Sequence, residues 1–169
     1  MSAMKLNEKI QLVEHNLEWK QQYLDEVTLL RQKSYLSTLE YEHIGSTSIP
    51  NIKTKPIIDI IIGVKNFPPQ REIIRELKEC GYVYMQEMSV CNRLYFIKRG
   101  IKNFNVHVIA FQGSVWCKDI LFRDYMINHL KEAQEYSDLK EEILRNGIDD
   151  LLEYSKRKAD FITRICEKL

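Results

Sequence analysis

The chain has 169 residues, of which 44% are hydrophobic and 29% are charged, and its formal net charge is +1. This length and composition allow a sizeable buried core, so we expect one soluble globular domain over residues 1–169. The near-neutral charge provides no overall field to attract nucleic acid or anionic lipid, although a local basic pocket is compatible with it.

The cysteine spacing and the lengths of the apolar runs exclude further classes of protein. Cys80, Cys91, Cys117 and Cys166 are scattered without a CxxC pair, which argues against a zinc cluster and against a thioredoxin-like site. The opening segment MSAMKLNEKIQ lacks the apolar core of a signal peptide, and the longest apolar run is far shorter than a membrane span. We therefore expect a cytoplasmic protein with reduced thiols and no membrane partner.

In chain order, the first predicted element is a helix over about residues 16–39. Asn16 can cap its start, and apolar side chains then recur at helical spacing among Lys, Gln, Glu and Arg. Residues 41–45 indicate a short strand that leads into the loop GSTS. Pro56 then starts a strand over residues 57–64, IIDIIIGV. Because this strand is apolar on both faces, it is expected in the middle of a sheet that is covered on both sides.

A second helix and three more strands are predicted next. Pro68–Pro69 opens the helix, which runs to about Cys80 and stops at Gly81. The three strands are expected at residues 82–87, 91–98 and 103–110. The segment RGIKN between the last two strands is typical of a hairpin turn.

From Ser114 onward the pattern is helical, in two or three pieces with a break near Asn146–Gly147. The whole order is helix, two strands, helix, three strands and a helical C-terminal tail. It predicts an α/β or α+β domain, in which a mixed β-sheet is flanked by helices.

A single carboxylate interrupts the apolar strand. Side chains alternate along a strand, so Asp59 shares a face with Ile57 and Ile61. An ionised carboxylate in such a place needs a cation, a metal ion or several N–H donors. Two interpretations stay open: a structural acid paired with an arginine or with loop amides, or an acid at the floor of a phosphate or metal site.

The loop GSTS before this strand carries groups that bind phosphate. Gly45 permits unusual backbone conformations, while Ser46 and Thr47 supply hydroxyls and backbone N–H groups that can turn toward phosphate oxygens. It is not a P-loop, because the GxxxxGK[ST] spacing is absent. The alternative is a turn whose hydroxyls cap nearby backbone groups.

Cationic side chains could converge on the same region. Lys55 follows the loop, Arg93 lies on a predicted strand, and Arg123 lies on a predicted helix. Arginine forms bidentate contacts with phosphate or carboxylate, which suits an anionic ligand. Arg123 could equally be the structural partner of Asp59 or of Asp124.

Longer stretches of the chain resemble a known family. A GS loop followed by an acid on an apolar strand is similar to the nucleotidyltransferase superfamily, in which the loop holds nucleotide phosphates and acids hold divalent metal. The segments LVEHNLEWKQQYLDE, HIGSTSIPNIKTKPIIDI, VHVI and LFRDY resemble more specifically the GrpB family of small bacterial proteins. This resemblance covers nearly the whole chain and implies a nucleotidyltransferase-like fold.

The sequence departs from the superfamily pattern at the metal-binding positions. Active nucleotidyltransferases usually have two acids at alternate positions of the strand, and here the second position is Ile61. The neighbouring predicted strand, NFNVHVIAF, offers His107 in place of a further acid. GrpB-like sequences often show His-x-His there, and Asn105 replaces the first histidine. A lone strand histidine can also be a semi-buried structural residue.

Together these features predict a pocket with a role for each side chain. Asp59 and His107 are the candidate catalytic residues, and Asp59 is the candidate ligand of Mg²⁺ or Mn²⁺. The candidate substrate-binding residues are Ser46, Thr47, Lys55, Arg93 and Arg123. The expected ligand is a nucleotide or another phosphate-containing small molecule. Three functions stay open: a divergent nucleotidyltransferase, a non-catalytic nucleotide-binding module, or an unrelated small-molecule enzyme on the same scaffold.

Overall fold

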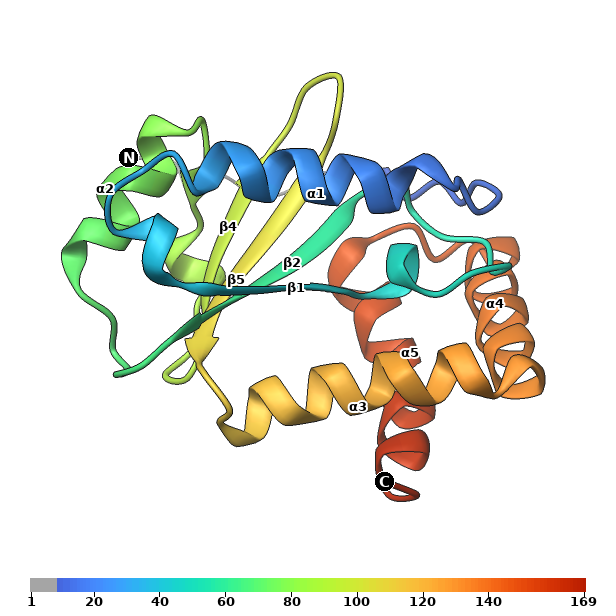
Figure 1. Ribbon diagram of the computed structural model, residues 1–169. Helices are drawn as coiled ribbons and strands as arrows, with labels where there is room; N and C mark the ends of the chain where they lie inside the picture. The colour runs from blue at the N-terminus through green and yellow to red at the C-terminus, as the bar shows by residue number, and fades with distance from the viewer. Residues whose placement is uncertain (1–8) are drawn as a thin grey trace.

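The computed structural model describes residues 9–169, so the first eight residues of the predicted domain, with most of the segment MSAMKLNEKIQ, lie outside the described residues. A five-stranded sheet is flanked by helices (Figure 1). The strands are β1 (Glu40–Ile44), β2 (Ile58–Val64), β3 (Val83–Tyr84), β4 (Leu94–Lys98) and β5 (Phe104–Ala110). The helices are α1 (Glu18–Leu30), α2 (Arg71–Glu79), α3 (Ser114–Asn128), α4 (Leu130–Arg145) and α5 (Leu151–Cys166).

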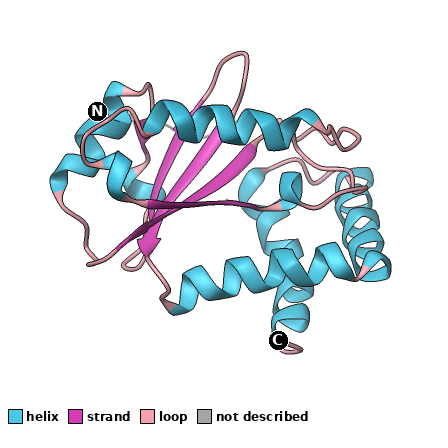
Figure 2. Cartoon of the chain, in the orientation of Figure 1, coloured by secondary structure: helices cyan, strands magenta, loops and turns pink. Residues whose placement is uncertain are grey.

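The sheet is mixed, as the sequence predicts, and has the strand order β1-β2-β5-β4-β3. β2 and β5 pair in parallel, whereas the other neighbouring strands pair antiparallel. Figure 2 shows the strands as one twisted sheet with helices around it. The predicted α+β class with a helical C-terminal region is therefore confirmed. β2 is an internal strand, although β5 occupies the central position.

The helices α1 and α2 cover one face of the sheet. Ile58, Ile60 and Ile62 of β2 project into this layer, where they pack with Leu30 of α1 and Leu77 of α2. All five side chains are buried. Burial of this kind contributes roughly 1.5–3 kcal/mol per large apolar side chain, so this layer is the main core of the molecule.

The helix α3 packs against the other face, and α4 and α5 pack against α3. Trp116 of α3 contacts a small apolar cluster made by Ile44, Ile61 and Ile109 of the sheet. A further cluster joins α4 and α5 to the segment that follows the loop GSTS, and its members include Ile49. The C-terminal helices therefore reach the end of the sheet where β1 stops and β2 begins.

Three predicted elements are too long, one of them the strand predicted at residues 91–98, which begins at Leu94. The first helix ends at Leu30 instead of near residue 39, because the backbone N–H groups of Tyr35 and Leu36 donate to the buried carboxylate of Glu76 on α2. The strand predicted at residues 82–87 pairs only over β3. Beyond β3 a short 3-10 turn over Gln86–Met88 replaces the extended conformation, so the regular ladder ends there, although the backbone N–H of Met85 still donates to the carbonyl of Tyr95.

The predicted helix stops are found. Gly81 (φ +87°) follows α2, and Gly147 (φ +76°) separates α4 from α5. Both residues adopt the left-handed conformation that favours glycine. The predicted hairpin over residues 99–103 is also present, because it connects the antiparallel strands β4 and β5.

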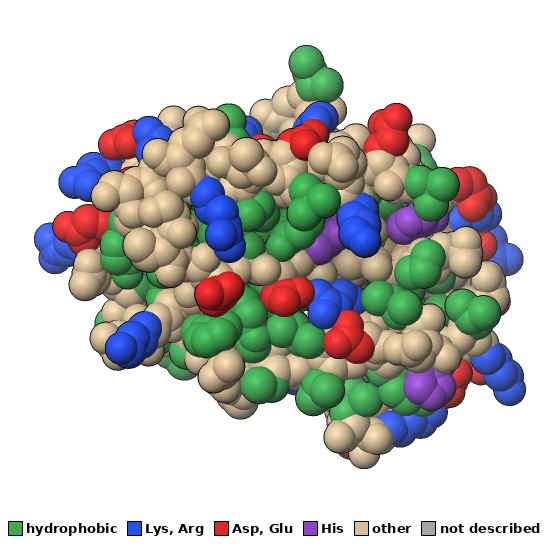
Figure 3. Space-filling view, viewed as in Figure 1, with side chains coloured by type: hydrophobic (Ala, Val, Ile, Leu, Met, Phe, Trp, Pro, Cys, Tyr) green, Lys and Arg blue, Asp and Glu red, His purple; other side chains and the backbone are tan. Residues whose placement is uncertain are grey.

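The surface carries mixed charge. On the face shown in Figure 3, acidic and basic side chains are interspersed. All four cysteines are free thiols. Among residues 9–169, no helix has both the length and the apolar composition that crossing a membrane requires.

Candidate functional site

The loop GSTS folds directly onto Asp59. Ile44, the last residue of β1, pairs with Asp59 in antiparallel register, and Gly45 follows with φ +71°. A Cβ atom at residue 45 would lie 2.4 Å from Oδ2 of Asp59. The backbone conformation and the close approach therefore both require glycine, and the loop and the carboxylate form one continuous surface.

Asp59 is oriented by an amide and not by a cationic side chain. The side chain of Asp59 is 27% exposed. Its Oδ1 accepts a hydrogen bond of 2.7 Å from Nδ2 of Asn105, whose own Oδ1 accepts one of 2.8 Å from Nη2 of Arg99. In the described part of the chain, no lysine or arginine forms an ion pair with Asp59. The structural interpretation that pairs Asp59 directly with an arginine is therefore not what the fold contains.

The surroundings keep the Asp59 carboxyl ionised. Burial by itself raises its pKa, but the His107 ring, the Asn105 amide and the charge of Lys55 together outweigh that effect, and the pKa lies below the usual value. A carboxylate that is ionised and partly open to solvent can bind a cation.

His107 lies beside Asp59 on the same face of the sheet, as the sequence predicts. Nε2 of His107 is 3.8 Å from Oδ1 of Asp59. The imidazole stacks on the ring of Tyr95, with 4.9 Å between ring centroids. Its Nδ1 is buried and has no hydrogen-bond partner among residues 9–169. Nε2 is therefore the ring nitrogen directed at the carboxylate.

Thr47 and His43 belong to the opposite face. His43 pairs with Ile60 in the register and stacks on Tyr23 of α1, with 5.1 Å between ring centroids. Nε2 of His43 and Oγ1 of the buried Thr47 lie 2.9 Å apart. The Thr47 hydroxyl is therefore engaged inside the fold, and its predicted phosphate contact stays a prediction. Ser46 is only partly buried, so it is the loop hydroxyl more accessible to a ligand, although a hydrogen-bonding interaction with it lowers the pKa of Tyr136 on α4.

The two candidate arginines already have acidic partners. Nη2 of Arg93 is 2.6 Å from Oδ2 of Asp119 on α3. Nη1 of Arg123 on α3 is 2.6 Å from Oε2 of Glu42 on β1, and its Nε is 2.8 Å from Oδ1 of Asp124. Of the two partners considered for Arg123, the structure contains Asp124. These ion pairs join α3 to the sheet, and the assignment of both arginines to substrate binding stays a prediction.

Sequence reasoning missed two lysines of the C-terminal helices. Lys140 of α4 is 1% exposed, and its Nζ donates to the backbone carbonyl of Lys53. Lys158 of α5 is half-buried, and the charge of Asp59 raises its pKa against the larger lowering effect of burial. One signal was available: Lys140 falls on the buried stripe of α4, four residues after Tyr136.

The residues around Asp59 fit one divalent ion at most. Among the described residues, no group of three or more His, Cys, Asp or Glu side chains is arranged to hold a metal. Ile61, at the position of the missing second acid, is buried against Trp116. Asp59 and His107 could supply two ligands, and Mg²⁺ commonly combines one or two carboxylates with phosphate oxygens and water. A metal here would thus depend on oxygens of the ligand.

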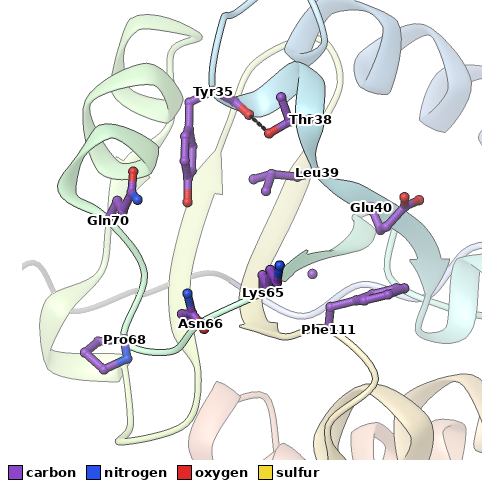
Figure 4. Close-up of a pocket in the computed structure, with 10 residues that line it drawn as sticks. Tyr35, Thr38, Leu39, Glu40, Lys65, Asn66, Pro68, Gln70 and Phe111 are labelled. Carbon is purple, nitrogen blue, oxygen red and sulfur yellow. Dashed lines mark hydrogen bonds between the residues drawn. The ribbon is translucent and has the colours of Figure 1, made fainter.

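A separate pocket lies at the other end of β2. Its cavity volume is about 570 Å³, and it opens beyond Gly63 between the turn that carries Tyr35 and the loop that carries Lys65 (Figure 4). Phe111, which follows β5, lines another side. None of the predicted site residues lines this pocket. The predicted site is instead the partly open surface around Asp59.

Comparisons with known proteins find relatives that match nearly the whole chain, although they differ in their own length. A family model described as GrpB protein matches residues 9–168. Glutamate-rich protein GrpB of Alkalihalophilus pseudofirmus is 30% identical over 164 residues, which cover 94% of each chain. UPF0157 protein YqkA of Bacillus subtilis is 31% identical over 155 residues, which cover 91% of this chain and 45% of that protein.

A solved structure gives the same result for the fold. The crystal structure of conserved protein GrpB from Enterococcus faecalis matches with a TM-score of 0.81 and 30% sequence identity. The match covers 94% of this chain and 96% of that chain.

Proposed function

The chain belongs to the GrpB family, and from that premise we propose that it binds a nucleotide or another small phosphate-containing ligand at the surface formed by the loop GSTS, Asp59 and His107. Membership in the family assigns no ligand by itself. The observation that supports the proposal is the contact between Gly45 and Asp59, which sets a loop rich in hydroxyl and backbone N–H groups against an ionised carboxylate.

The electrostatics of Asp59 support a ligand site over a structural acid. A buried carboxylate that only stabilises the fold is normally neutralised by a directly paired cation, because an unpaired buried charge is costly. Asp59 instead receives the amide of Asn105 and faces the histidine ring of His107, while part of its surface stays open to solvent. Its negative charge is therefore available to an incoming cation.

Four of the predicted residues have a place in this proposal. Asp59 and His107 would hold a divalent ion, and that ion supplies the positive charge that joins the carboxylate to an anionic phosphate. Ser46 would donate its hydroxyl to a phosphate oxygen. Lys55, whose charge already acts on Asp59, would balance further negative charge of the ligand.

The acid content favours a binding module over a two-metal transferase. Two-metal transfer needs several carboxylates around a pair of ions. The alternate position on β2 is Ile61, whose side chain is committed to the apolar cluster under α3, so no second acid can come from that position. A divergent transferase is the second candidate, and the proximity of His107 to Asp59 is the observation that favours it.

Thermal-shift measurements with nucleoside triphosphates test the proposal, with and without Mg²⁺ or Mn²⁺. A ligand that binds only the folded state raises Tm by mass action. We expect a metal-dependent rise for the natural chain and for Asp149→Asn, an exposed matched control. The rise should vanish for Asp59→Asn. Equal shifts for the natural chain and Asp59→Asn, or none up to millimolar ligand, would contradict the proposal.

Pyrophosphate release separates the two candidate functions. Binding without metal-dependent pyrophosphate release across a wide panel of acceptors supports the binding module. Release that disappears in both Asp59→Asn and His107→Asn supports the transferase.

A further inference from the structure

Two lysines of the C-terminal helices, Lys140 and Lys158, are wholly or partly shielded from solvent and form no ion pair with an acidic side chain in the described chain. Nζ of Lys140 lies 4.8 Å from the ring centroid of Tyr136, and Nζ of Lys158 lies 4.6 Å from the ring centroid of Tyr154. Lys140 donates a hydrogen bond to a backbone carbonyl. In the chain from residue 9 onward, neither lysine forms an ion pair with a carboxylate.

The packing of α4 and α5 brings both lysines to the end of the sheet that carries Asp59. Oγ of Ser137 on α4 accepts a hydrogen bond of 2.9 Å from the backbone N–H of Lys53, which lies between the loop GSTS and Lys55. Ile49, directly after the loop, packs with Phe161 of α5. The same helices that carry the lysines are therefore anchored on the segment that joins the loop to β2.

The mutual effects of the charged groups agree with this placement. Burial, with a smaller contribution from the charge of Lys158, lowers the pKa of Lys140 to about 7. The charge of Asp59 acts on Lys158 and also on Tyr136, whose pKa burial raises to about 12. Two lysines within electrostatic reach of each other repel, so the folded chain keeps them together at a cost in stability.

A pair of partly desolvated cations without acidic partners is the arrangement that binds a multiply charged anion. Lys53, a neighbouring lysine, differs from this pair because it already forms an ion pair. Its Nζ lies 2.5 Å from Oε1 of Glu141. Lys140 and Lys158, by contrast, have no carboxylate within ion-pair distance among residues 9–169, and each Nζ lies over an aromatic ring. An anionic group that bridges them would remove their repulsion.

We infer that Lys158, with Lys140 behind it, forms the subsite for a polyphosphate tail of the ligand held at Asp59. This inference rests on the proposed function and names its substrate class as a ligand with two or more linked phosphates. The head of the ligand lies toward Ser46 and Asp59, and the tail extends toward α5. Because Lys158 is only half-buried, it makes the direct contact, and the fully buried Lys140 acts as a positioning charge.

Binding titrations with adenosine mono-, di- and triphosphate and with inorganic tripolyphosphate, all with Mg²⁺, test the subsite. The variants are Lys158→Gln, Lys158→Arg and the control Lys156→Gln, an exposed lysine on the same helix. We expect the affinity of the natural chain to rise with the number of phosphates. Lys158→Gln should weaken triphosphate and tripolyphosphate binding by about tenfold, the effect of losing one charge-assisted contact. Monophosphate binding should stay within about twofold.

The remaining variants and outcomes separate this inference from the proposed function. Lys158→Arg should keep most of the triphosphate affinity, and Lys156→Gln should bind as the natural chain does. If the three nucleotides bind alike and Lys158→Gln changes none of them, the subsite is absent while the proposed function stands. If tripolyphosphate binds through Lys158 and no nucleotide binds, the subsite stands and the nucleotide assignment fails. If nothing binds, both fail.

Discussion

The two faces of β2 carry different kinds of side chain. On the face beneath α1 and α2, the side chains of Ile58, Ile60 and Ile62 are all buried. On the face beneath α3, Ile61 is buried as well, but Asp59 is partly open to solvent. α3 covers the middle of this second face through Trp116 and leaves the beginning of the strand to the loop GSTS and the C-terminal helices.

This difference teaches where a charge can sit on an otherwise apolar strand. Asp59 occurs where the cover changes from a packed helix to a loop, so its carboxylate can keep contact with water and with polar partners. The first face has no such opening within β2. Because side chains alternate along a strand, one face of β2 serves the apolar core and the other face carries the candidate ligand site.

The largest expected effect comes from opening a cavity on the first face. Ile60→Ala removes a fully buried side chain from the core under α1, and such truncations cost about 2–5 kcal/mol in the free energy of unfolding. Urea denaturation measures this loss. The folded fraction should bind ligand with unchanged affinity, because Ile60 lies on the face away from Asp59. A large loss of affinity in the folded protein would break the separation of the two faces.

A histidine on the first face should make stability depend on pH. Burial lowers the pKa of His43 to about 4, so protons bind the unfolded chain first as the pH falls from about 6.5. The free energy of unfolding should then decrease by up to about 3 kcal/mol as the pH falls to 4. His43→Gln should remove this dependence. If the free energy of unfolding depends on pH in the same way for the natural chain and for His43→Gln, then His43 does not cause the pH dependence.

Gly45→Ala tests the contact between the loop and the carboxylate. A non-glycine residue in the left-handed conformation costs about 1–3 kcal/mol. In addition, the new Cβ would meet the Asp59 carboxylate. We therefore expect a moderate loss in the free energy of unfolding together with weaker ligand binding. Gly100→Ala is the matched control, because a Cβ there meets nothing within 4 Å. Equal behaviour of the two variants would show that the loop is not held against Asp59.

The smallest effect on stability is expected at Asp59 itself. Asp59→Asn should change the free energy of unfolding at pH 7 by no more than about 1 kcal/mol, because no paired lysine or arginine in the described chain is left without its partner. A loss of 3–5 kcal/mol, typical of breaking a buried ion pair, would mean that Asp59 is a structural residue.

The pH dependence of the same variant gives a finer check. The pKa of Asp59 is lowered in the folded state, so its ionised form contributes stability above the pKa of the unfolded chain. That contribution is lost as the pH falls through the folded-state pKa. The natural chain should therefore lose more stability than Asp59→Asn when the pH is lowered below about 4. Denaturation at two pH values measures the difference.

Local patterns predicted much of the fold and the centre of the site. Alternation along β2 places Asp59 opposite the core, and the strand that carries His107 is recognisable by the same pattern. The helix stops at Gly81 and Gly147 also follow from local backbone preferences. These features depend on neighbours close in the chain, which a sequence displays directly.

The partners of charged residues came only from the tertiary structure. Arg93 pairs with Asp119 and Arg123 with Glu42 because α3 packs across the sheet, and nothing within either local segment indicates these partners. The early end of α1 has a similar origin, since its cause is a carboxylate on α2. Salt bridges of this kind join residues far apart in the chain, so their partners depend on how the helices dock.

The sequence by itself therefore determined the α+β class, the strand that carries Asp59 and the residue that accompanies it, His107. Only the tertiary structure decided that Asn105 would orient Asp59, and that Lys140 and Lys158 would arrive at its end of the sheet. The physical reason is the distance along the chain over which each effect acts. Backbone preference and side-chain alternation act over a few residues, whereas the surroundings of a buried charge are set by whichever distant segments pack against it.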